Sequence, residues 1–307
     1  MGGLARIAVV VAAVATVSLI AGAAPPVSAT VTVTSHFIQT ATTSNLIAAG
    51  AFTEINNAAT NGNPNAILFV TTVFNSGGVC GCVAFADPVA VFYLAGDQKW
   101  AVTDAAINSI PVGAQFNVLV VQKPSSSVFT ATANSSNISG NGFTLSQKST
   151  VGKGTDLLQV TQNYTPGGHS VPSINPHTPG VVYGAGTGKQ WDIQNLDNAA
   201  MPSGASYNVM VGSGASNGGK AVLLTGNSSN TNGITTTINN AETNGNPNAV
   251  VFETQDFDPN LQFGTNFPHQ TGVGYANSPT DQGYVVALDG APMPTTTHYF
   301  NLLIFGS

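Results

Sequence analysis

The sequence predicts an all-β fold of three tandem units, each an antiparallel β-sandwich-like repeat of about 91 residues. Closely similar segments recur along the chain, and β-branched and aromatic residues gather in short runs bounded by Gly, Pro, Asn or Asp. No long stretch with a helical apolar period follows the N-terminal segment. A single pseudo-threefold closed body, such as a β-propeller with two blades per unit, is the alternative architecture.

The repeat is clearest in a 15-residue segment that occurs twice. It reads INNAATNGNPNAILF over Ile55–Phe69 and INNAETNGNPNAVVF over Ile238–Phe252, with 12 of the 15 positions identical. The separation of 183 residues is about twice 91, and Trp100 and Trp191 are 91 residues apart. A more diverged middle copy fits between them, because PVGAQFNV is followed 91 residues later by PSGASYNV. Three units therefore fill the chain.

Residues 1–29 have the features of a secretory signal peptide. Arg6 supplies a positive start, an apolar run covers 7–24, and VSA at 27–29 fits the small-residue cleavage rule. An uncleaved membrane anchor is the alternative, because the run approaches spanning length. No charged flank follows the run, so we expect cleavage before Thr30 and a secreted, extracellular protein that keeps no membrane segment.

The rest of the chain divides into β repeats at residues 30–122, 123–213 and 214–307, here called units 1, 2 and 3. The connections QKPSSS and GSGASNGG are rich in Ser and Gly and too short to hold the units far apart. In unit 1, strands are expected at 30–41, 66–74, 89–95, 99–104 and 115–122.

The TNGNPNA segment is first interpreted as a rigid turn. Asn-Gly tolerates positive φ, Pro presets its own φ, and Asn side chains close turns onto their own backbone. The alternative is an amide-rich loop that hydrogen-bonds a sugar or a partner, although the middle unit loses these asparagines. The candidate ligand-binding residues are then Asn61, Asn63, Asn65, Asn244, Asn246 and Asn248.

Trp100 and Trp191 have two interpretations as well. Sugars stack on flat aromatic rings, so these residues are candidate carbohydrate platforms. Large aromatics at matching repeat positions also fill matching cores, and core packing is the competing interpretation.

The composition excludes some partners. Charged residues make up only 7% of the chain, against about 25% in ordinary globular proteins. Without Arg6 there are 6 basic and 13 acidic residues, a net charge of −7. This balance argues against nucleic acid and anionic lipid as partners. An extracellular polysaccharide or another cell-surface protein is expected instead.

Cys80 and Cys82 are separated by one residue. A disulfide across that spacing is strained, so free thiols or an intermolecular link are alternatives to a pair within the chain. A metal site would need further ligands, and none follows at metal-binding spacing.

No catalytic constellation stands out. Ser216 lies in a G-x-S-x-G pattern, but in a junction with no helix after it. The five histidines show no recurrence at the repeat period. Asp256 and Asp258 form the densest oxygen cluster and would supply only two or three of the six to eight oxygens that Ca²⁺ takes. We expect no cofactor, no metal and no enzyme activity.

TNGNPNA with its apolar strand, TQNYTPGG, Trp191 and MPSGASYNVMV together resemble a family of secreted bacterial modules. These modules have about 90 residues each, are often tandem and have no established function. The resemblance covers all three units, and Tyr284 of unit 3 stands near the tryptophan position. It implies modularity and transfers no catalytic residue. We expect a non-catalytic secreted or cell-surface structural or adhesive protein. A carbohydrate-binding module protein and a secreted hydrolase, whose paired carboxylates would meet only in space, are the alternatives.

Overall fold

The computed structural model describes residues 31–75, 83–184, 188–212, 215–216, 218–276 and 282–306. This part of the chain is built from strands, turns and three short 3₁₀ segments, η1 (Ala48–Gly50), η2 (Pro166–Gly168) and η3 (Pro259–Leu261). The prediction of an all-β fold is confirmed.

Each unit contributes seven strands in the same order along the chain. Unit 1 has β1 (Ser35–Thr40), β2 (Leu46–Ile47), β3 (Phe52–Glu54), β4 (Ile67–Asn75), β5 (Val89–Leu94), β6 (Lys99–Asp104) and β7 (Gln115–Val121). Unit 2 has β8 (Val128–Thr132), β9 (Ile138–Ser139), β10 (Gly142–Thr144), β11 (Leu157–Asn163), β12 (Pro179–Tyr183), β13 (Trp191–Asn195) and β14 (Ser206–Gly212). Unit 3 has β15 (Lys220–Gly226), β16 (Thr231–Asn232), β17 (Thr235–Ile238), β18 (Val250–Asp258), β19 (Thr271–Ala276), β20 (Gln282–Ala287) and β21 (His298–Phe305).

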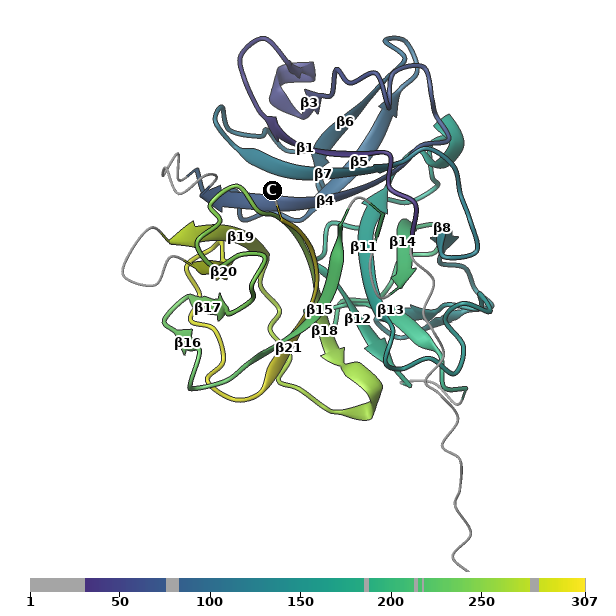
Figure 1. Cartoon of the computed structure of the whole chain (residues 1–307). Helices are drawn as coiled ribbons and strands as arrows, with labels where there is room; N and C mark the ends of the chain where they lie inside the picture. The colour runs from purple at the N-terminus through teal and green to yellow at the C-terminus, as the bar shows by residue number, and fades with distance from the viewer. Residues whose placement is uncertain are drawn as a thin grey trace, which may run out of the picture.

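The 21 strands form three seven-stranded sheets, and each sheet draws on two units (Figure 1). Three strands of one unit, its first, seventh and fourth, lie beside four strands of another unit, its fifth, sixth, third and second. The orders are β1-β7-β4-β19-β20-β17-β16, β15-β21-β18-β12-β13-β10-β9 and β8-β14-β11-β5-β6-β3-β2.

The junction within each sheet is a parallel strand pair, whereas all other named pairs are antiparallel. β4 of unit 1 pairs with β19 of unit 3, β18 of unit 3 with β12 of unit 2, and β11 of unit 2 with β5 of unit 1. This cycle joins the units into one pseudo-threefold body. The closure comes from sheets shared between neighbours and not from propeller blades.

Each unit keeps its own sandwich core between its two half-sheets. In unit 1, Leu68 of β4 and Phe116 of β7 pack with Val91 of β5 and Trp100 of β6, and all four are buried. The apolar faces of these strands therefore meet inside the unit, as the alternation of side chains along strands requires. Unit 2 repeats this arrangement around Trp191.

A further core lies where the three units meet. Phe69 of unit 1, Met210 of unit 2 and Phe252 of unit 3 belong to one buried cluster. Residues of the seventh strands of units 1 and 3, β7 and β21, also belong to it. Because large apolar side chains from every unit share this core, removing one unit would expose the faces of the other two.

Three equivalent threonines form a ring around the pseudo-threefold axis. The hydroxyls of Thr71, Thr161 and Thr254 each accept a hydrogen bond from a backbone N–H of the fourth strand of a neighbouring unit, at 3.0, 2.9 and 3.1 Å. Below this ring, Asn117 and Asn208 donate to backbone carbonyls of neighbouring units at 2.8 and 2.9 Å. These five hydrogen bonds each pair a buried polar group of one unit with a neighbouring unit.

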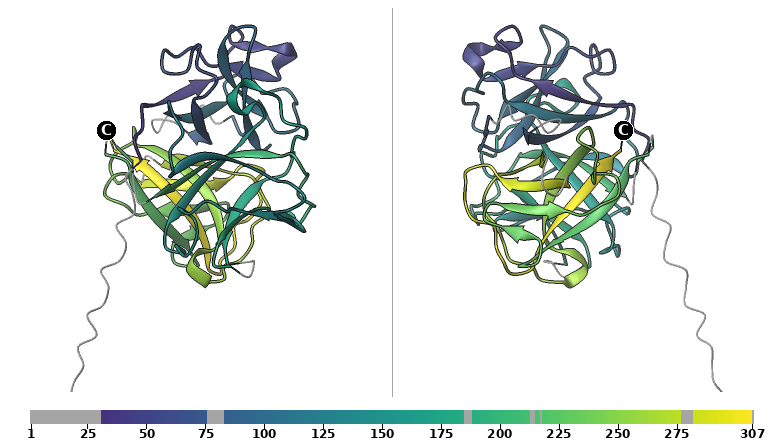
Figure 2. Two further views of the ribbon diagram at one scale, coloured as in Figure 1. Left: turned by 90° about the vertical axis from the view of Figure 1, so that its right-hand side faces the viewer. Right: turned by 60° about the vertical axis from the view of Figure 1, so that its left-hand side comes forward.

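The start of the described chain is fastened to the junction of units 2 and 3. Val31 forms a parallel bridge with Ala215, and the Ser216 hydroxyl accepts from the Val33 N–H at 2.7 Å. His36 stacks on Phe305 with ring centroids 4.3 Å apart. The N-terminal segment and the C-terminal strand therefore lie side by side (Figure 2).

Candidate functional site

The two tryptophans lie in the cores of units 1 and 2. Trp100 and Trp191 are 0% exposed. Their rings contact Tyr93 and Tyr183 with centroid distances of 5.5 and 5.3 Å. A fully buried ring offers no face to a sugar, so this placement corrects the expectation of a stacking platform and agrees with the core interpretation.

Each indole is also tied to the repeated turn. The Trp100 N–H donates to the Asn63 carbonyl at 2.9 Å, and the Trp191 N–H donates to the Lys153 carbonyl at 3.0 Å. Because the acceptor is a backbone carbonyl, the side chain of the same residue can be replaced without loss of this hydrogen bond. The middle unit can therefore lose its asparagines and still hold its tryptophan.

The amide side chains of the unit 1 turn hydrogen-bond within the turn. Asn61 donates to the Asn56 side chain at 2.9 Å, and the Asn63 side chain accepts from the Asn65 N–H at 3.2 Å. The second is the hydrogen bond of an Asx turn, and together the two bonds fix the local backbone. They agree with the interpretation of this segment as a rigid turn.

The unit 3 turn makes the same bonds and also borders a cavity. Asn244 donates to Asn239 at 2.8 Å, and Asn246 accepts from the Asn248 N–H at 3.3 Å. Asn246 and Asn248 line a cavity of about 210 Å³ at the boundary of units 3 and 1. The structure thus places two of the six candidate asparagines at the edge of a cavity.

The cavity is walled by both units. Unit 1 contributes Ile38, Val73 and Asn75, while unit 3 contributes Val251 and Tyr275. Its described lining contains no charged side chain. A ligand of this cavity would accordingly be neutral and partly apolar.

Strand register explains why this cavity forms where unit 3 borders unit 1, whereas buried tryptophans fill the equivalent positions of the other two units. Tyr275 of β19 faces Gly283 of β20, in the register where a tyrosine faces a tryptophan in the other two units. Gly283 therefore occupies the tryptophan position. Tyr284 is one residue further along, and successive side chains of a strand point to opposite faces. Tyr284, which the sequence places near the tryptophan position, thus lies one residue beyond it.

A second, smaller cavity of about 40 Å³ lies beside the threonine ring. It is lined by Val70 of unit 1, Val160 of unit 2 and, at the equivalent position of unit 3, Glu253. The Thr271 hydroxyl donates to one carboxyl oxygen of Glu253 at 2.8 Å. Burial raises the pKa of Glu253 to about 7, and the hydrogen bond from Thr271 only partly opposes this rise.

Replacing Glu253 with the valine of the other two units is expected to stabilise the protein at pH 8. The folded-state pKa is raised, so the stability that the protonated carboxyl supplies is complete below pH 4.5 and is lost as the pH rises through about 7. The full shift corresponds to about 3 kcal/mol. Because the side chain is partly accessible, we expect Glu253→Val to raise the free energy of unfolding by about 2 kcal/mol at pH 8. At pH 4.5 the increase should be much smaller.

Urea unfolding followed by tryptophan fluorescence at the two pH values measures this difference. Glu253→Gln is the control, since it removes the charge and keeps the shape, and it should remove most of the same pH dependence. An equal gain for Glu253→Val at both pH values would show that ionisation of Glu253 is not the cause.

Asp256 and Asp258 are buried at the end of β18 and do not form an open loop. Burial raises the pKa of Asp256 to about 8, hydrogen bonds from Asn301 and the Asp258 N–H oppose the rise, and the charge of Asp258 adds to it. Within the described ranges, no cluster of three acidic, histidine or cysteine side chains is present. The oxygen cluster noted in the sequence is therefore the buried end of a strand.

A recurrence of histidines escaped the sequence interpretation. His177 and His269 are 92 residues apart, and each contacts an aspartate 20 residues later, Asp197 at 2.6 Å and Asp289 at 2.5 Å. The expectation that no histidine recurs at the repeat period is therefore wrong. The spacing of the two histidines exceeds the period of 91 residues by one residue. A search for a His followed by an Asp at the same distance in each copy would have found the two pairs.

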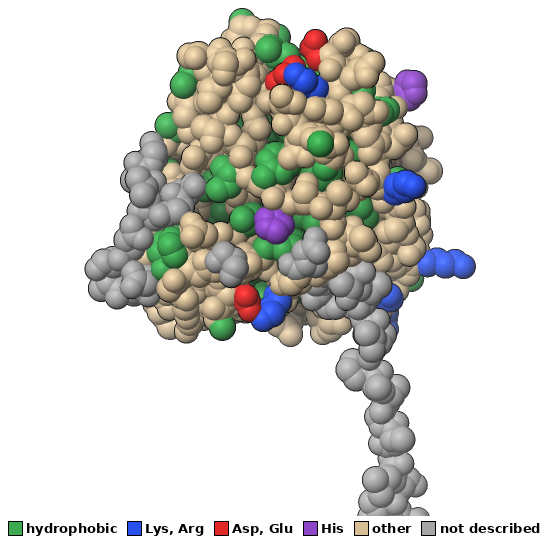
Figure 3. All heavy atoms as spheres, turned by 45° about the horizontal axis from the view of Figure 1, so that its top comes forward, with side chains coloured by type: hydrophobic (Ala, Val, Ile, Leu, Met, Phe, Trp, Pro, Cys, Tyr) green, Lys and Arg blue, Asp and Glu red, His purple; other side chains and the backbone are tan. Residues whose placement is uncertain are grey.

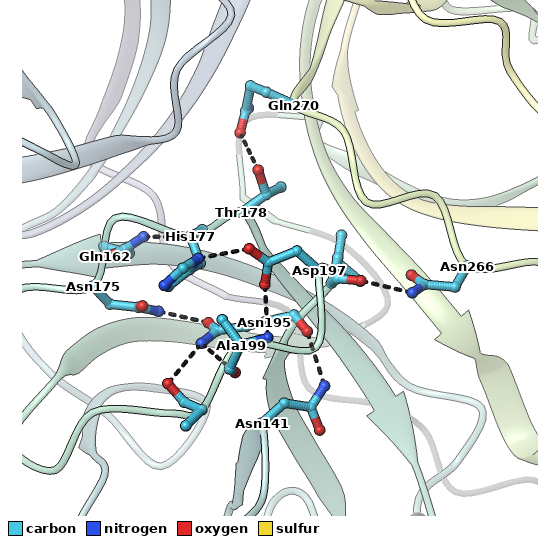
Figure 4. A network of polar contacts seen from close by, with 12 residues as sticks. Asn141, Gln162, Asn175, His177, Thr178, Asn195, Asp197, Ala199, Asn266 and Gln270 are labelled. Carbon is cyan, nitrogen blue, oxygen red and sulfur yellow. Dashed lines mark hydrogen bonds and ion pairs between the residues drawn. The ribbon is translucent and has the colours of Figure 1, made fainter.

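The His177 pair fastens loops to one another (Figure 4). Gln162 donates to the His177 carbonyl at 3.0 Å, and Asp197 accepts from the Ala199 N–H at 3.0 Å. Across the unit boundary, Asn266 of unit 3 donates to a unit 2 carbonyl at 2.7 Å. In the described part of the chain, neither imidazole of the two His–Asp pairs hydrogen-bonds a hydroxyl or thiol. These two His–Asp pairs therefore do not have the geometry of an activated nucleophile.

Three sequence predictions remain to be located: the cysteine pair, Ser216 and the membrane-spanning segment. Cys80 and Cys82 lie outside the described residues. Ser216 holds the N-terminal segment through Val33, and no helix follows it, so it is not placed as in a nucleophile elbow. Across the residues that the structure describes, no helix has the length and apolar character needed to cross a membrane.

Comparison with known proteins identifies the repeated domain. A family model described as a domain of unknown function (DUF7452) matches residues 11–120, 90–211 and 180–304. Neither the curated proteins nor the solved structures contain a match. Successive matches overlap over strands β5–β7 and β12–β14, so the family domain extends beyond a single 91-residue period. The chain therefore belongs to the DUF7452 family and carries its domain three times.

Proposed function

We propose that this chain is an exported, non-catalytic structural or adhesive protein of the cell surface or the extracellular medium. The observation that supports this most is the sharing of every sheet between two units, which joins three repeats into one body. Such a body keeps its shape and can present fixed surface features to a partner. The acidic and histidine side chains described above take part in packing and in fastening loops, which fits a structural role.

The low charge of the surface favours a partner that binds through uncharged groups. Figure 3 shows few charged side chains on one face, some of them in contact as pairs of opposite charge, with hydrophobic side chains gathered near its middle. A sparsely charged surface that is rich in amides suits a neutral polysaccharide or another cell-surface protein. A carbohydrate-binding function would have to use such surface groups, since the two tryptophans are buried.

The segment after β18 offers an apolar contact point. Leu261 is 53% exposed and Phe263 is 74% exposed. Two large, exposed apolar side chains two residues apart on one segment mark an interaction site, whereas singly exposed apolar residues are ordinary. We propose that this pair contributes to attachment.

Retention on the producing cells tests the proposal. Intact mass of protein from the culture medium should first show a mature chain that starts near Thr30. The double substitution Leu261→Ser and Phe263→Ser should then lower the amount of added protein retained by the cells at least about fivefold, the size of effect that loss of one apolar anchor gives. Val112→Ser, at a residue that is 57% exposed, is the matched control and should leave retention unchanged.

Two outcomes decide between the candidates. Retention that survives removal of surface polysaccharide but not of surface protein would identify a protein partner, and the reverse would favour carbohydrate binding. Equal retention of the double variant and the unsubstituted protein, or recovery of the protein only inside the cells, would contradict the proposal.

The hydrolase alternative is the less supported one. Asp87 and Asp104 form one described carboxyl pair, in which burial and the hydrogen bond that the two groups share raise the pKa of Asp87. Glycosidases that act through two carboxyl groups hold them about 5 Å or more apart, which a hydrogen-bonded pair does not reach. A panel of polysaccharide and ester substrates should therefore show no turnover.

A further inference from the structure

The tryptophan positions of units 1 and 2 show what the corresponding position of unit 3 is shaped to hold. In unit 1, Trp100 contacts Tyr93 and donates its N–H to the carbonyl of Asn63. Unit 2 repeats both contacts around Trp191. Two independent copies thus define one pocket for an indole, with a tyrosine on one wall and a turn carbonyl at its end.

Unit 3 keeps the walls of this pocket. Tyr275 takes the place of the wall tyrosine, and Asn246 is the turn residue equivalent to Asn63. Thr243 is buried like its counterparts Thr60 and Thr150 in the other units. The surroundings of the ring are therefore retained in a unit that has lost the ring itself.

Gly283 stands where the tryptophan is attached in the other units, and it borders a cavity. Gly283, Thr243, Asn246 and Tyr275 all line the cavity of about 210 Å³. A side chain grown from Gly283 would meet Thr243 at 3.3 Å, a contact that a shift of a few tenths of an ångström relieves. The cavity is thus continuous with the space of a missing tryptophan.

We propose that this cavity binds a flat, neutral, two-ring aromatic group, for which indole is the model. Apolar cavities of about 150 Å³ already accept a benzene-sized ring, and this one is larger. Tyr275, Val73 and Val251 supply aromatic and aliphatic walls, and the described lining carries no charge. The ligand chemistry follows from the side chain that fills the same space in the other two units.

The position of the cavity gives binding a structural consequence. Val73 and Asn75 of β4 line it from unit 1, and β4 is the strand that pairs with β19 of unit 3. An aromatic guest would contact both sides of this parallel junction. Binding is expected to stabilise the folded body as ligand linkage requires, with a melting temperature that rises with indole concentration.

Titration calorimetry with indole tests the proposal on the mature full chain. We expect a dissociation constant of about 1 mM or lower, which suits a ligand of nine heavy atoms. N-acetyltryptophanamide in a parallel titration distinguishes a free small molecule from a tryptophan side chain of a peptide as the source of the ring. Glucose, a neutral ligand with no aromatic ring, should show no heat of binding.

Variants locate the site. Gly283→Trp should restore the arrangement of the other units, abolish indole binding and raise the melting temperature in the absence of ligand. Gly283→Leu is the second variant in case the larger residue prevents folding, and it should weaken binding at least about tenfold. Val112→Trp adds a tryptophan on the surface and should bind indole as the unsubstituted protein does.

Three results would overturn the proposal. One is the absence of indole binding at 10-fold above the expected dissociation constant of about 1 mM. The second is unchanged indole affinity in a folded Gly283→Trp or Gly283→Leu variant. The third is a glucose affinity equal to that for indole, which would identify the cavity as a sugar site. None of these readouts depends on attachment to cells, so the outcome is separate from that of the proposed function.

Discussion

Trp191→Ala is expected to lower the free energy of unfolding by about 4 kcal/mol, among the largest effects of a single core substitution. The indole is fully buried in the unit 2 core and packs against Tyr183. Its N–H also satisfies the Lys153 carbonyl. Truncation leaves a cavity and removes that hydrogen bond. Urea unfolding monitored by circular dichroism measures the loss.

Two further substitutions make this test specific. Trp191→Phe keeps an aromatic ring but loses the N–H, and about half of the destabilisation is expected. Trp100→Ala should match Trp191→Ala within about 1 kcal/mol, because both residues have the same surroundings and core costs scale with the space left. A loss below about 1 kcal/mol in Trp191→Ala would contradict the core assignment.

Unit 2 alone, residues 123–213, is expected not to exist as a stable monomer and to assemble into a homotrimer. In the full chain β11 pairs with β5 of unit 1, and β12 pairs with β18 of unit 3. Isolation exposes both of these parallel edges, and exposed edges recruit new partners. Since β5 and β18 are the equivalents of β12 and β11, three copies of unit 2 can close the same cycle.

Light scattering after size-exclusion chromatography measures the mass of the isolated unit. Thr161→Val is the matched variant, because the Thr161 hydroxyl accepts the Val70 N–H across the unit boundary and would be lost three times in a homotrimer. We expect it to weaken assembly by about 1 kcal/mol for each lost bond. A monodisperse monomer with a cooperative unfolding transition would refute the expectation.

The sequence alone predicted three tandem repeats and most of the long strands. The expected strand at 66–74 is β4, and that at 115–122 is β7, within one residue at each end. Short strands such as β2 were missed because two residues carry no readable alternation. The exchange of half-sheets between units was also missed, because hydrophobic patterning shows which face is buried but not which distant strand lies alongside.

The candidate cavity depended on register, which the sequence leaves open. The sequence places Tyr284 near the tryptophan position. Only the pairing of Tyr275 with Gly283 shows that Gly283 holds that position and that Tyr284 points to the opposite face. Glu253 could have been noticed by comparing the copies, since Val70 and Val160 occupy the same position. The two His–Asp pairs could not be recognised from the repeat period, because their histidines are 92 and not 91 residues apart and because the His–Asp contact exists only in the folded structure.

The pairing of β4 with β19 sets the order in which this chain can finish folding. Val73 reaches its partner Val273 only after some 200 further residues have been synthesised. Contacts between residues so far apart in the chain slow folding and leave partly folded chains open to aggregation. The first domain to be made is consequently among the last to be completed, and a chain that terminates early cannot hide the edge it leaves unpaired.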